Sequence, residues 1–370
     1  MDLYPRDRIA LAAQAAAKAG LDALLLTPGP DLRYLTGYDT HASERLTCLA
    51  VPAEGGAGAA FLLAPQLEQR SVRASPAGAM GIDVLAWDET DDPYRMVRQR
   101  LGSPGRVGLA DTMWAMTVLA FRDALPGAQL ALASAALREM RMRKSAAEVE
   151  ALREAGAAID RVHVQVSGLL RAGRTERAVA TDIAAAITAE GHVRADFVIV
   201  ASGPNAARPH HSPGDRALGP GDAVVVDIGG TMPSGYCSDC TRTYFIGAPP
   251  PEFAGYYQVL KDAQEAACQW VRPGVSAESV DAAARDPITA AGHGEHFVHR
   301  TGHGIGLETH ENPYIVAGNI SALEPGMTFS VEPGIYPGPH GARIEDIVVC
   351  TPDGHERLNN ASRELVVAGA

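Results

Sequence analysis

Short apolar runs alternate with amphipathic segments along the first third of the chain. Residues 6–19 have helical spacing and end at Gly20, and residues 22–27 are an apolar run typical of a buried strand. Further strand-like runs and two helical patterns follow, the runs at Leu46–Val51, Ala59–Leu63, Ile82–Trp87, Val107–Ala110 and Gln129–Ala133 and the helices at Tyr94–Leu101 and Met113–Ala124. This alternation predicts an α/β domain of roughly 130 residues.

The pattern changes near residues 134–144, where the basic run LREMRMRKS precedes a new helix. Ser145 and Glu148 fit a capping box at the start of this helix. More helices and strands are predicted beyond it, the helices at Thr175–Glu190, Tyr256–Trp270 and Ser276–Ala291 (disturbed by Pro287) and the first strand at Phe197–Ala201. The end of the chain is strands and Gly-rich turns, so we expect an α+β domain over residues 138–370 after an N-terminal domain over 1–137.

A predicted hairpin in the second domain carries two aspartates. Its sequence, VVVDIGGTMPSGYCSDCTRT, has Asp227 and Asp239 on either side of a turn cluster. With the turn centred near Pro233, the two residues pair directly, their Cβ atoms roughly 4.5–5.5 Å apart. Two like charges there destabilise the hairpin unless a cation lies between them. Taken alone, the hairpin is also compatible with two solvated carboxylates.

Three further segments offer metal-type ligands. TGHGIGLETHENP contains His303 and His310, MTFSVEPG contains Glu332, and ARIEDIVV contains Glu345. Arg343 is expected on the same strand face as Glu345, because strand side chains alternate. Each of the two glutamates interrupts an apolar strand, where a buried carboxylate costs several kcal/mol unless it is paired or metal-bound.

Four carboxylates with one imidazole form a chemically specific set. Their negative charge is neutralised by two divalent cations, and hard oxygen donors favour Mn²⁺, with Zn²⁺ or Co²⁺ also compatible. Such a pair of metals, about 3.5–4 Å apart, can bridge and deprotonate a water. Competing signatures fail: HExxH has Tyr314 in place of its second histidine, and no GxSxG is present. Cys237 and Cys240 form a CxxC without a second pair.

Composition narrows the function classes. Of 370 residues, 46% are hydrophobic and 21% charged, as in ordinary soluble proteins. The formal net charge of −12 argues against nucleic acid, whose phosphates need a basic surface, and suits a site that binds cations. Five scattered cysteines indicate a reducing compartment. With no signal-peptide pattern and no run near the ~18 residues of a membrane span, we expect a cytoplasmic protein that binds no membrane.

The order Asp, Asp, His, Glu, Glu within these motifs resembles the metallopeptidase family of Xaa-Pro dipeptidases (prolidases), Xaa-Pro aminopeptidases and methionine aminopeptidases. The resemblance covers essentially the whole chain. It implies a pita-bread catalytic domain, in which two related α+β halves place the ligands in a central cleft. The motif LRYLTGY, which begins at Leu32, resembles the creatinase-like N-terminal domain of the proline-specific branch.

The resemblance also implies a role for each ligand-type residue. Asp227 would bind the first metal, Asp239 and Glu345 would bridge both, and His303 and Glu332 would hold the second. Glu332 would also accept the proton of the bridging water. The spacing of the two aspartates is one residue longer than the family commonly shows, and we expect the extra residue in the turn near 232–233.

Three further histidines match motif positions that line the substrate side in the family. His210 lies in PNAARPHHSP, His299 lies in FVHRTGH, and His310 follows at the end of the next motif. The resemblance implies that they stabilise the tetrahedral intermediate or shuttle protons. His211 and His293 match no motif position and are expected to be surface or packing residues.

The resemblance implies a homodimeric exopeptidase that cleaves Xaa-Pro bonds. A dipeptide substrate ends in a free carboxylate, which needs a fixed cation. Arg343 is shared across the family, and Arg300 is expected to point away from the cleft by strand alternation. Arg208, two residues from His210, is unusual and favours the dipeptidase over the aminopeptidase. The filled ligand positions argue against a metal-free creatinase-like amidinohydrolase and a non-catalytic binding module.

Overall fold

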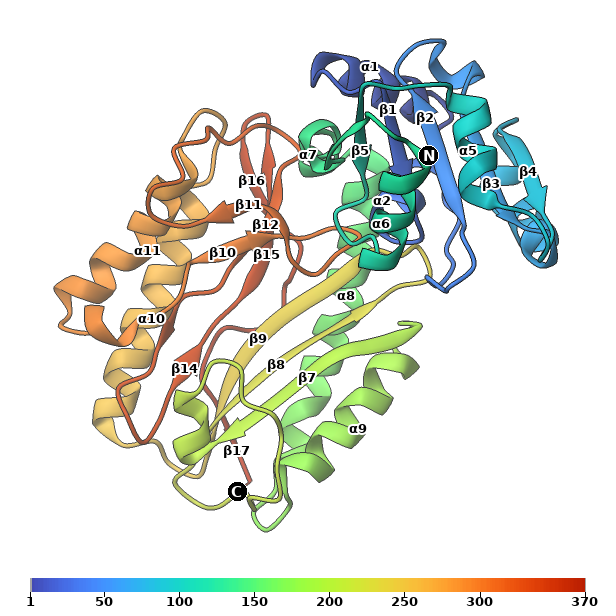
Figure 1. Ribbon diagram of the computed structural model, residues 1–370. Coiled ribbons are helices and arrows are strands. Elements are labelled where there is room, and N and C mark those ends of the chain that lie inside the picture. The colour runs from blue at the N-terminus through green and yellow to red at the C-terminus, as the bar shows by residue number, and fades with distance from the viewer. Residues whose placement is uncertain (1, 370) are drawn as a thin grey trace. The chain divides into compact units, whose positions relative to one another are not determined.

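The computed structural model describes residues 2–369, and the chain divides into two compact units, Met1–Arg141 and Met142–Ala370 (Figure 1). Each unit is described by itself below. Among the described residues, no helix combines the length and the apolar character that crossing a membrane requires.

The first unit is built on a six-stranded mixed sheet with the order β4-β3-β2-β1-β5-β6. β2 runs antiparallel to both of its neighbours, whereas the β3–β4, β1–β5 and β5–β6 pairs are parallel. The strands are β1 (Ala23–Leu26), β2 (Cys48–Pro52), β3 (Phe61–Pro65), β4 (Asp83–Trp87), β5 (Arg106–Leu109) and β6 (Gln129–Leu132). This confirms the predicted α/β class.

The helices of this unit connect and flank the strands. They are α1 (Asp7–Lys18), α2 (Pro30–Thr36), α3 (Gln69–Ala74), α4 (Pro76–Ala79), α5 (Pro93–Leu101), α6 (Ala115–Ala124) and α7 (Ser134–Met142), the last at the join with the second unit. The LRYLTGY motif, for which no secondary structure was predicted, forms most of α2. This helix begins with Pro30 and ends where Gly37 adopts a left-handed conformation with φ 67°.

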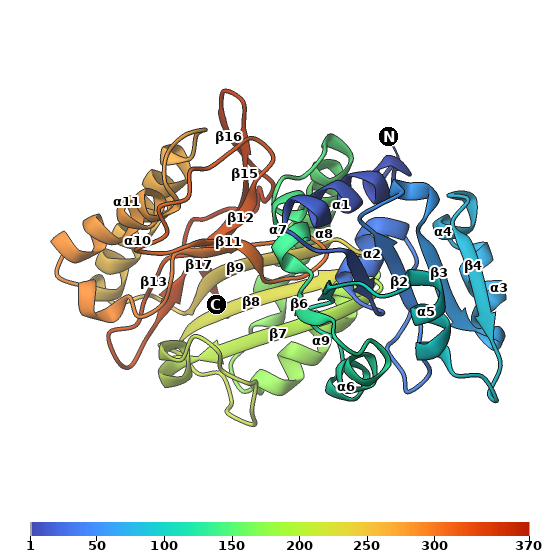
Figure 2. The same ribbon diagram turned by 45° about the horizontal axis from the view of Figure 1, so that its top comes forward.

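The second unit begins with two helices that pack against one sheet. The helices are α8 (Ala146–Leu169), which has the predicted Ser145–Glu148 capping box, and α9 (Glu176–Ala189). The sheet has the order β17-β9-β8-β7, formed by β7 (Arg194–Ser202), β8 (Ala223–Thr231), β9 (Cys237–Ile246) and β17 (Val366–Ala368). Both helices lie on the same side of this sheet (Figure 1, Figure 2).

Alternation along β8 and β9 separates a helix-covered face from a polar one. Val224, Val226 and Ile228 pack with the apolar residues of α8 and α9. Asp227, between two of these residues, therefore points to the opposite face, and Asp239 of β9 shares that face because it pairs with Gly229. That face meets the second half of the unit.

The second half has its own pair of helices and a five-stranded sheet. The helices are α10 (Pro251–Trp270) and α11 (Ala277–Ala290), and Pro287 lies inside α11, which continues through it. The sheet has the order β11-β10-β12-β15-β16, with β10 (Gly302–Gly304), β11 (Glu311–Ile315), β12 (Thr328–Val331), β15 (Asp346–Thr351) and β16 (Gly354–Arg357). A separate pair consists of β13 (Gly334–Ile335) and β14 (Ala342–Arg343).

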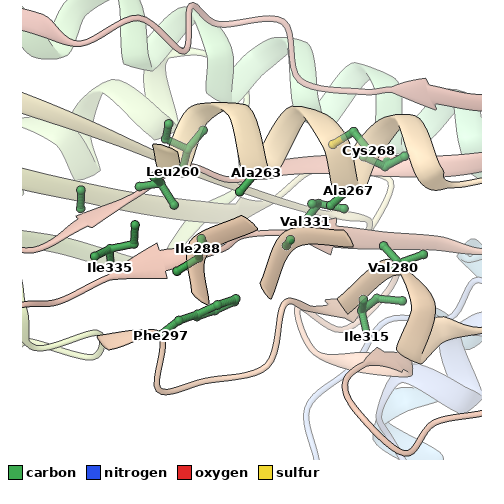
Figure 3. Close-up of a cluster of buried hydrophobic side chains, with 14 of the residues drawn as sticks. Leu260, Ala263, Ala267, Cys268, Val280, Ile288, Phe297, Ile315, Val331 and Ile335 are labelled. Carbon is green, nitrogen blue, oxygen red and sulfur yellow. The ribbon is translucent and has the colours of Figure 1, made fainter. Parts of the chain in front are cut away.

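An apolar core joins these helices to the strands that carry the candidate ligands. Leu260 and Ala263 of α10 point toward Val331 of β12 and Ile335 of β13 (Figure 3). Glu332 lies between those two strand residues, so packing of α10 fixes its backbone. The two α+β halves confirm the predicted pita-bread catalytic domain.

Candidate active site

The hairpin brings the two aspartates to one face in a register different from the predicted one. Asp239 pairs with Gly229 and Asp227 with Thr241, because the register is centred on Ser234 and not on Pro233. The carboxylates are therefore diagonal neighbours and not a direct pair. Diagonal positions still share a face and are about 7–8 Å apart at the backbone, within reach of side chains that converge.

The other three ligand-type residues come from the second half of the unit. His303 lies in β10, and Glu332 follows the last residue of β12. The predicted continuous strand at residues 342–349 is broken, and Glu345 lies in the gap between β14 and β15. Its backbone N–H donates to the carbonyl of Thr241, which ties this gap to β9.

These side chains converge into three overlapping groups. In each group the ligand atoms lie within 4.8 Å of one another. Asp227, Asp239 and Glu345 form the first group, and His303 and Glu332 join Glu345 in the second. The third group contains Asp239, His303 and also His310, which the sequence placed outside the ligand set.

Packing these acids together strongly disfavours their charged forms. Burial, with the charges of Glu345 and Asp227 nearby, raises the pKa of Asp239 well above its ordinary value. Burial and the charges of Glu332 and Asp227 likewise raise the pKa of Glu345 well above its ordinary value. Cations between the carboxylates would remove this penalty.

Arg343 supplies one cation from the protein itself. Its Nη2 donates to Asp227 Oδ2 at 2.6 Å, its Nη1 donates to the Tyr336 hydroxyl at 2.8 Å, and its Nε donates to Thr241 Oγ1 at 3.2 Å. Burial still raises the pKa of Asp227, although Arg343 opposes the change. The other oxygen, Asp227 Oδ1, is buried without a hydrogen-bond partner in the described chain.

Glu332 differs from the other acids because an imidazole faces it. Its Oε1 lies 3.2 Å from His303 Nε2 and accepts a hydrogen bond from Ser330 Oγ at 3.0 Å. Burial favours the neutral acid, but the hydrogen bond and charge of His303, with His299 and Arg343, outweigh it and lower the pKa of Glu332 to about 2. This carboxylate is therefore ionised at neutral pH.

A cavity of about 840 Å³ opens beside these groups. All five ligand-type residues line it, together with His210, His299, His310 and Arg343. Its apolar wall is formed by Phe197, Val198 and Ile199 of β7. The structure thus brings every predicted ligand-type and catalytic residue to one cavity.

The three predicted catalytic histidines differ in how free their ring nitrogens are. His299 has both nitrogens engaged, with Nδ1 2.7 Å from the carbonyl of Arg300 and Nε2 2.9 Å from the Tyr336 hydroxyl. Burial, with the charges of His303 and Arg300 nearby, lowers the pKa of His310 to about 4, so its ring is neutral at neutral pH. His210 is exposed, and no hydrogen bond to its ring is present within residues 2–369.

The structure places Arg208 and Arg300 opposite to the prediction: Arg300 lines the cavity and Arg208 does not. Arg208, predicted on the substrate rim, is exposed and does not line the cavity. Arg300, predicted to point away, does line it, and its guanidinium carbon lies 4.4 Å from the centre of the Tyr314 ring. The alternation argument fails because residues 298–301 precede β10 and are not a strand. Arg300 makes no ion pair with any described acid.

His211 also differs from its prediction as a surface or packing residue. It lines the same cavity, and its Nε2 lies 2.7 Å from the carboxylate of Glu176, which is fully buried. The sequence signal was the repeated histidine in PHHSP, but no pattern in the sequence connects it to the start of α9.

The residues present fit two divalent cations. Oxygen donors predominate, one imidazole is available, Asp227 Oδ1 lacks a partner within the described residues, and the paired acids have raised pKa values. No donor in the set is a thiolate, which disfavours soft metals.

Comparisons with known proteins identify both units. Residues 150–352 match metallopeptidase family M24, and residues 8–143 match the creatinase/prolidase N-terminal domain. The chain is 54% identical to the probable dipeptidase PepE of Mycobacterium tuberculosis over 99% of this chain and 97% of that protein. It is 36% identical to the Xaa-Pro dipeptidase of Lactobacillus helveticus, covering 91% and 92% of the two chains.

A solved structure is similar to this chain in both sequence and fold. The crystal structure of dipeptidase PepE from Mycobacterium ulcerans is 54% identical, superposes with a TM-score of 0.91, and covers 97% of this chain and 96% of its own. The match to family M24 contains all five candidate ligands. The chain is therefore a metallopeptidase that belongs to family M24 and has a creatinase/prolidase N-terminal domain.

Proposed function

We propose that this metallopeptidase is an Xaa-Pro dipeptidase that works with two divalent metal ions. Asp227, Asp239, His303, Glu332 and Glu345 would hold the metals, and Mn²⁺ is the metal that their oxygen-rich set favours. The observation that carries the dipeptidase assignment is Arg300, a cation in the cavity wall with no acidic partner among the described residues. The dipeptidase names of the relatives support the same choice.

Two bound divalent ions supply electrostatic activation of a water and polarisation of the scissile carbonyl. Glu332, ionised and hydrogen-bonded by Ser330, accepts the proton of the attacking water on its carboxylate. The Ser330 hydroxyl donates to Glu332 Oε1, and the His303 ring nitrogen Nε2 lies 3.2 Å from the same oxygen, so both keep this carboxylate in one orientation. These contacts are formed before substrate arrives.

His210 and His310 are the substrate-facing hydrogen-bond donors in the proposal. Each lines the cavity, and the neutral His310 ring can donate an N–H to a developing oxyanion. His299 has no free ring nitrogen, because Tyr336 and the Arg300 carbonyl engage both. We therefore assign His299 to orienting Tyr336, whose hydroxyl also accepts from Arg343.

The free carboxylate of a dipeptide would bind to Arg300. Arg343 lines the cavity too, but its donors are already used by Asp227, Tyr336, Thr241 and the Pro209 carbonyl. Stacking on Tyr314 holds the Arg300 plane while leaving its edge N–H groups free. The cytoplasmic location, the homodimer and the domain boundary after residue 137 remain predictions that accompany this proposal.

The test compares hydrolysis of Leu-Pro, Leu-Pro-amide and Leu-Pro-Leu by the wild type, Arg300→Leu and the matched control Arg208→Leu. The wild type should prefer Leu-Pro. Arg300→Leu should lose roughly 10–100-fold in kcat/KM on Leu-Pro, the value of about 1.5–3 kcal/mol for a charge-assisted contact, and little on the amide. Arg208→Leu should match the wild type.

Each part of the proposal has its own contradicting result. A wild type that prefers Leu-Pro-Leu would indicate an Xaa-Pro aminopeptidase. Equal losses on the acid and the amide would remove Arg300 from carboxylate recognition. Absence of hydrolysis of all three peptides by metal-loaded protein would overturn the Xaa-Pro assignment itself.

A further inference from the structure

One wall of the cavity is a segment without regular strand structure. Residues 203–213 begin with a short 3₁₀ helix, Gly203–Ala207, and continue with a turn at 209–210 and irregular backbone. Pro209, His210, His211, Ser212 and Pro213 line the cavity. Such a segment has no ladder of hydrogen bonds to fix it. Its position must be set by contacts at its ends and along its length.

A single buried carboxylate makes five of those contacts, in addition to the Arg343 contact to the Pro209 carbonyl. Glu176 Oε1 accepts from the Ser202 backbone N–H at 2.8 Å, the Ser202 hydroxyl at 2.7 Å and the Asn205 amide at 3.0 Å. Its Oε2 lies 2.7 Å from His211 Nε2 and accepts from the Gly214 N–H at 3.1 Å. Glu176 is therefore attached to the two residues that flank the segment, Ser202 and Gly214, and to Asn205 and His211 within it.

Glu176 is suited to this task because it is an anion that does not move. It is fully buried at the first residue of α9, where the helix dipole favours negative charge. Burial alone would raise the pKa of Glu176, but the hydrogen bonds from Asn205, Ser202 and His211 outweigh it and lower the pKa. A buried carboxylate with this many donors stays ionised and fixed.

His211 connects this anchor to the cavity. Its Nε2 must carry a proton to donate to the ionised carboxylate, and its Nδ1 makes no hydrogen bond to another described residue. The preceding His210 has no hydrogen bond of its own to another described residue, so its ring depends on its backbone for position. The backbone at 210 is held on one side by the contact made at 211 and on the other by Arg343 Nη2, which donates to the Pro209 carbonyl at 3.3 Å.

We propose that Glu176 and His211 form a positioning pair that fixes residues 203–213 and thereby sets the place of the His210 ring. The effect on turnover rests on the proposed function, in which His210 faces the substrate. The anchoring of the segment does not, because it follows from the contacts alone.

The test uses His211→Leu and His211→Gln, with His293→Leu as a matched control outside the cavity. Glutamine can place an N–H near the position of the histidine Nε2, whereas leucine cannot. In His211→Leu, amide hydrogen exchange of residues 202–214 should accelerate, and kcat on Leu-Pro should fall roughly 10–100-fold with KM and metal content little changed, as for other residues that orient a site. His211→Gln should restore both properties substantially.

If His211→Leu left both amide hydrogen exchange of residues 202–214 and kcat unchanged, the proposed positioning role of Glu176 and His211 would be overturned. A glutamine variant with wild-type exchange but the kcat of the leucine variant would also overturn it, since the imidazole would then act chemically and not by position. If the wild type hydrolysed no Xaa-Pro peptide, the proposed function would fail, and the exchange measurement alone would decide the anchor. The control His293→Leu should behave like the wild type throughout.

Discussion

The charges of single residues in the site do not balance. Four acids converge beside Arg343, whose guanidinium donates a hydrogen bond to Asp227 at 2.6 Å. The single positive charge of Arg343 does not neutralise the four carboxylates, because the pKa values of Asp239 and Glu345 are still raised. The site is therefore stable in its charged form only with further positive charge.

His310 is the residue whose role is most sharply testable. Its ring centre lies 3.9 Å from that of His303, and it can also join Asp239 and His303 in one ligand group. If it acts on the substrate, His310→Ala should lower kcat by roughly 10²–10⁴-fold, as for a positioned acid–base group, with the metal content unchanged. Elemental analysis of the purified variant, together with its kinetics, distinguishes the two roles. Loss of metal from the variant would show that His310 is a metal ligand.

The ligand-type residues could be predicted from sequence because each occupies a motif with its own chemistry. Arg300 and His211 could not, since their positions depend on non-strand segments for which alternation gives no direction. The predicted pairing of Asp227 with Asp239 is also wrong. The turn is centred on Ser234, and alternation along the strands does not reveal where a turn is centred.

Among the elements, β10 and β12 approach each other unusually closely. A Cβ on Gly302 would collide with the backbone carbonyl of Ser330, and the next residue, His303, donates its N–H to Ser330 Oγ at 3.0 Å. The glycine thus permits the approach that brings His303 and Glu332 together. No sequence pattern predicts this contact, because Gly302 and Ser330 are 28 residues apart in the chain.

Gly302→Ala should therefore destabilise the protein by about 1–3 kcal/mol, the usual cost of overpacking, and weaken metal binding through His303. Gly255→Ala is the matched control, because a Cβ there meets no described atom within 4 Å on the exposed surface of α10. That control should be neutral or stabilise by up to about 1 kcal/mol. Urea unfolding of both variants compares them, and an unaffected Gly302→Ala would refute the close approach.

The packing of α8 on β9 contains a buried histidine that links stability to pH. His163 hydrogen-bonds through one ring nitrogen to the Tyr244 hydroxyl and through the other to the Cys240 carbonyl, both at 3.0 Å. Burial, with the charge of Arg242, lowers the pKa of His163 from 6.5 to about 3. Below pH 6.5 the unfolded chain therefore binds a proton that the folded chain excludes.

The contribution of neutral His163 is complete above pH 6.5 and is lost as the pH falls toward 3. The loss amounts to about 2 kcal/mol between pH 7 and pH 5. His163→Gln, which stays neutral, should be less sensitive to acid by that amount. Urea unfolding of chelator-treated protein at the two pH values measures the difference, and parallel losses in variant and wild type would contradict the assignment.

At the scale of the whole molecule, neither half of the second unit holds a complete site. The first half supplies Asp227 and Asp239, and the second supplies His303, Glu332 and Glu345. The halves are joined beside the site by Arg242 of β9, which donates to Asp346 Oδ1 at 2.7 Å and to the Glu345 carbonyl at 2.6 Å. Metal binding is therefore coupled to folding of the complete unit.

The most direct test of the central claim is the metal content per chain, measured with Leu-Pro hydrolysis during titration of metal-free protein. The wild type should bind two equivalents of Mn²⁺ and gain activity as they bind. Asp239→Ala, which removes the carboxylate shared by two ligand groups, should bind neither metal tightly and stay inactive, whereas the exposed control Asp286→Ala should match the wild type. Two tightly bound metals and normal turnover in Asp239→Ala, or full wild-type activity without metal, would contradict the account.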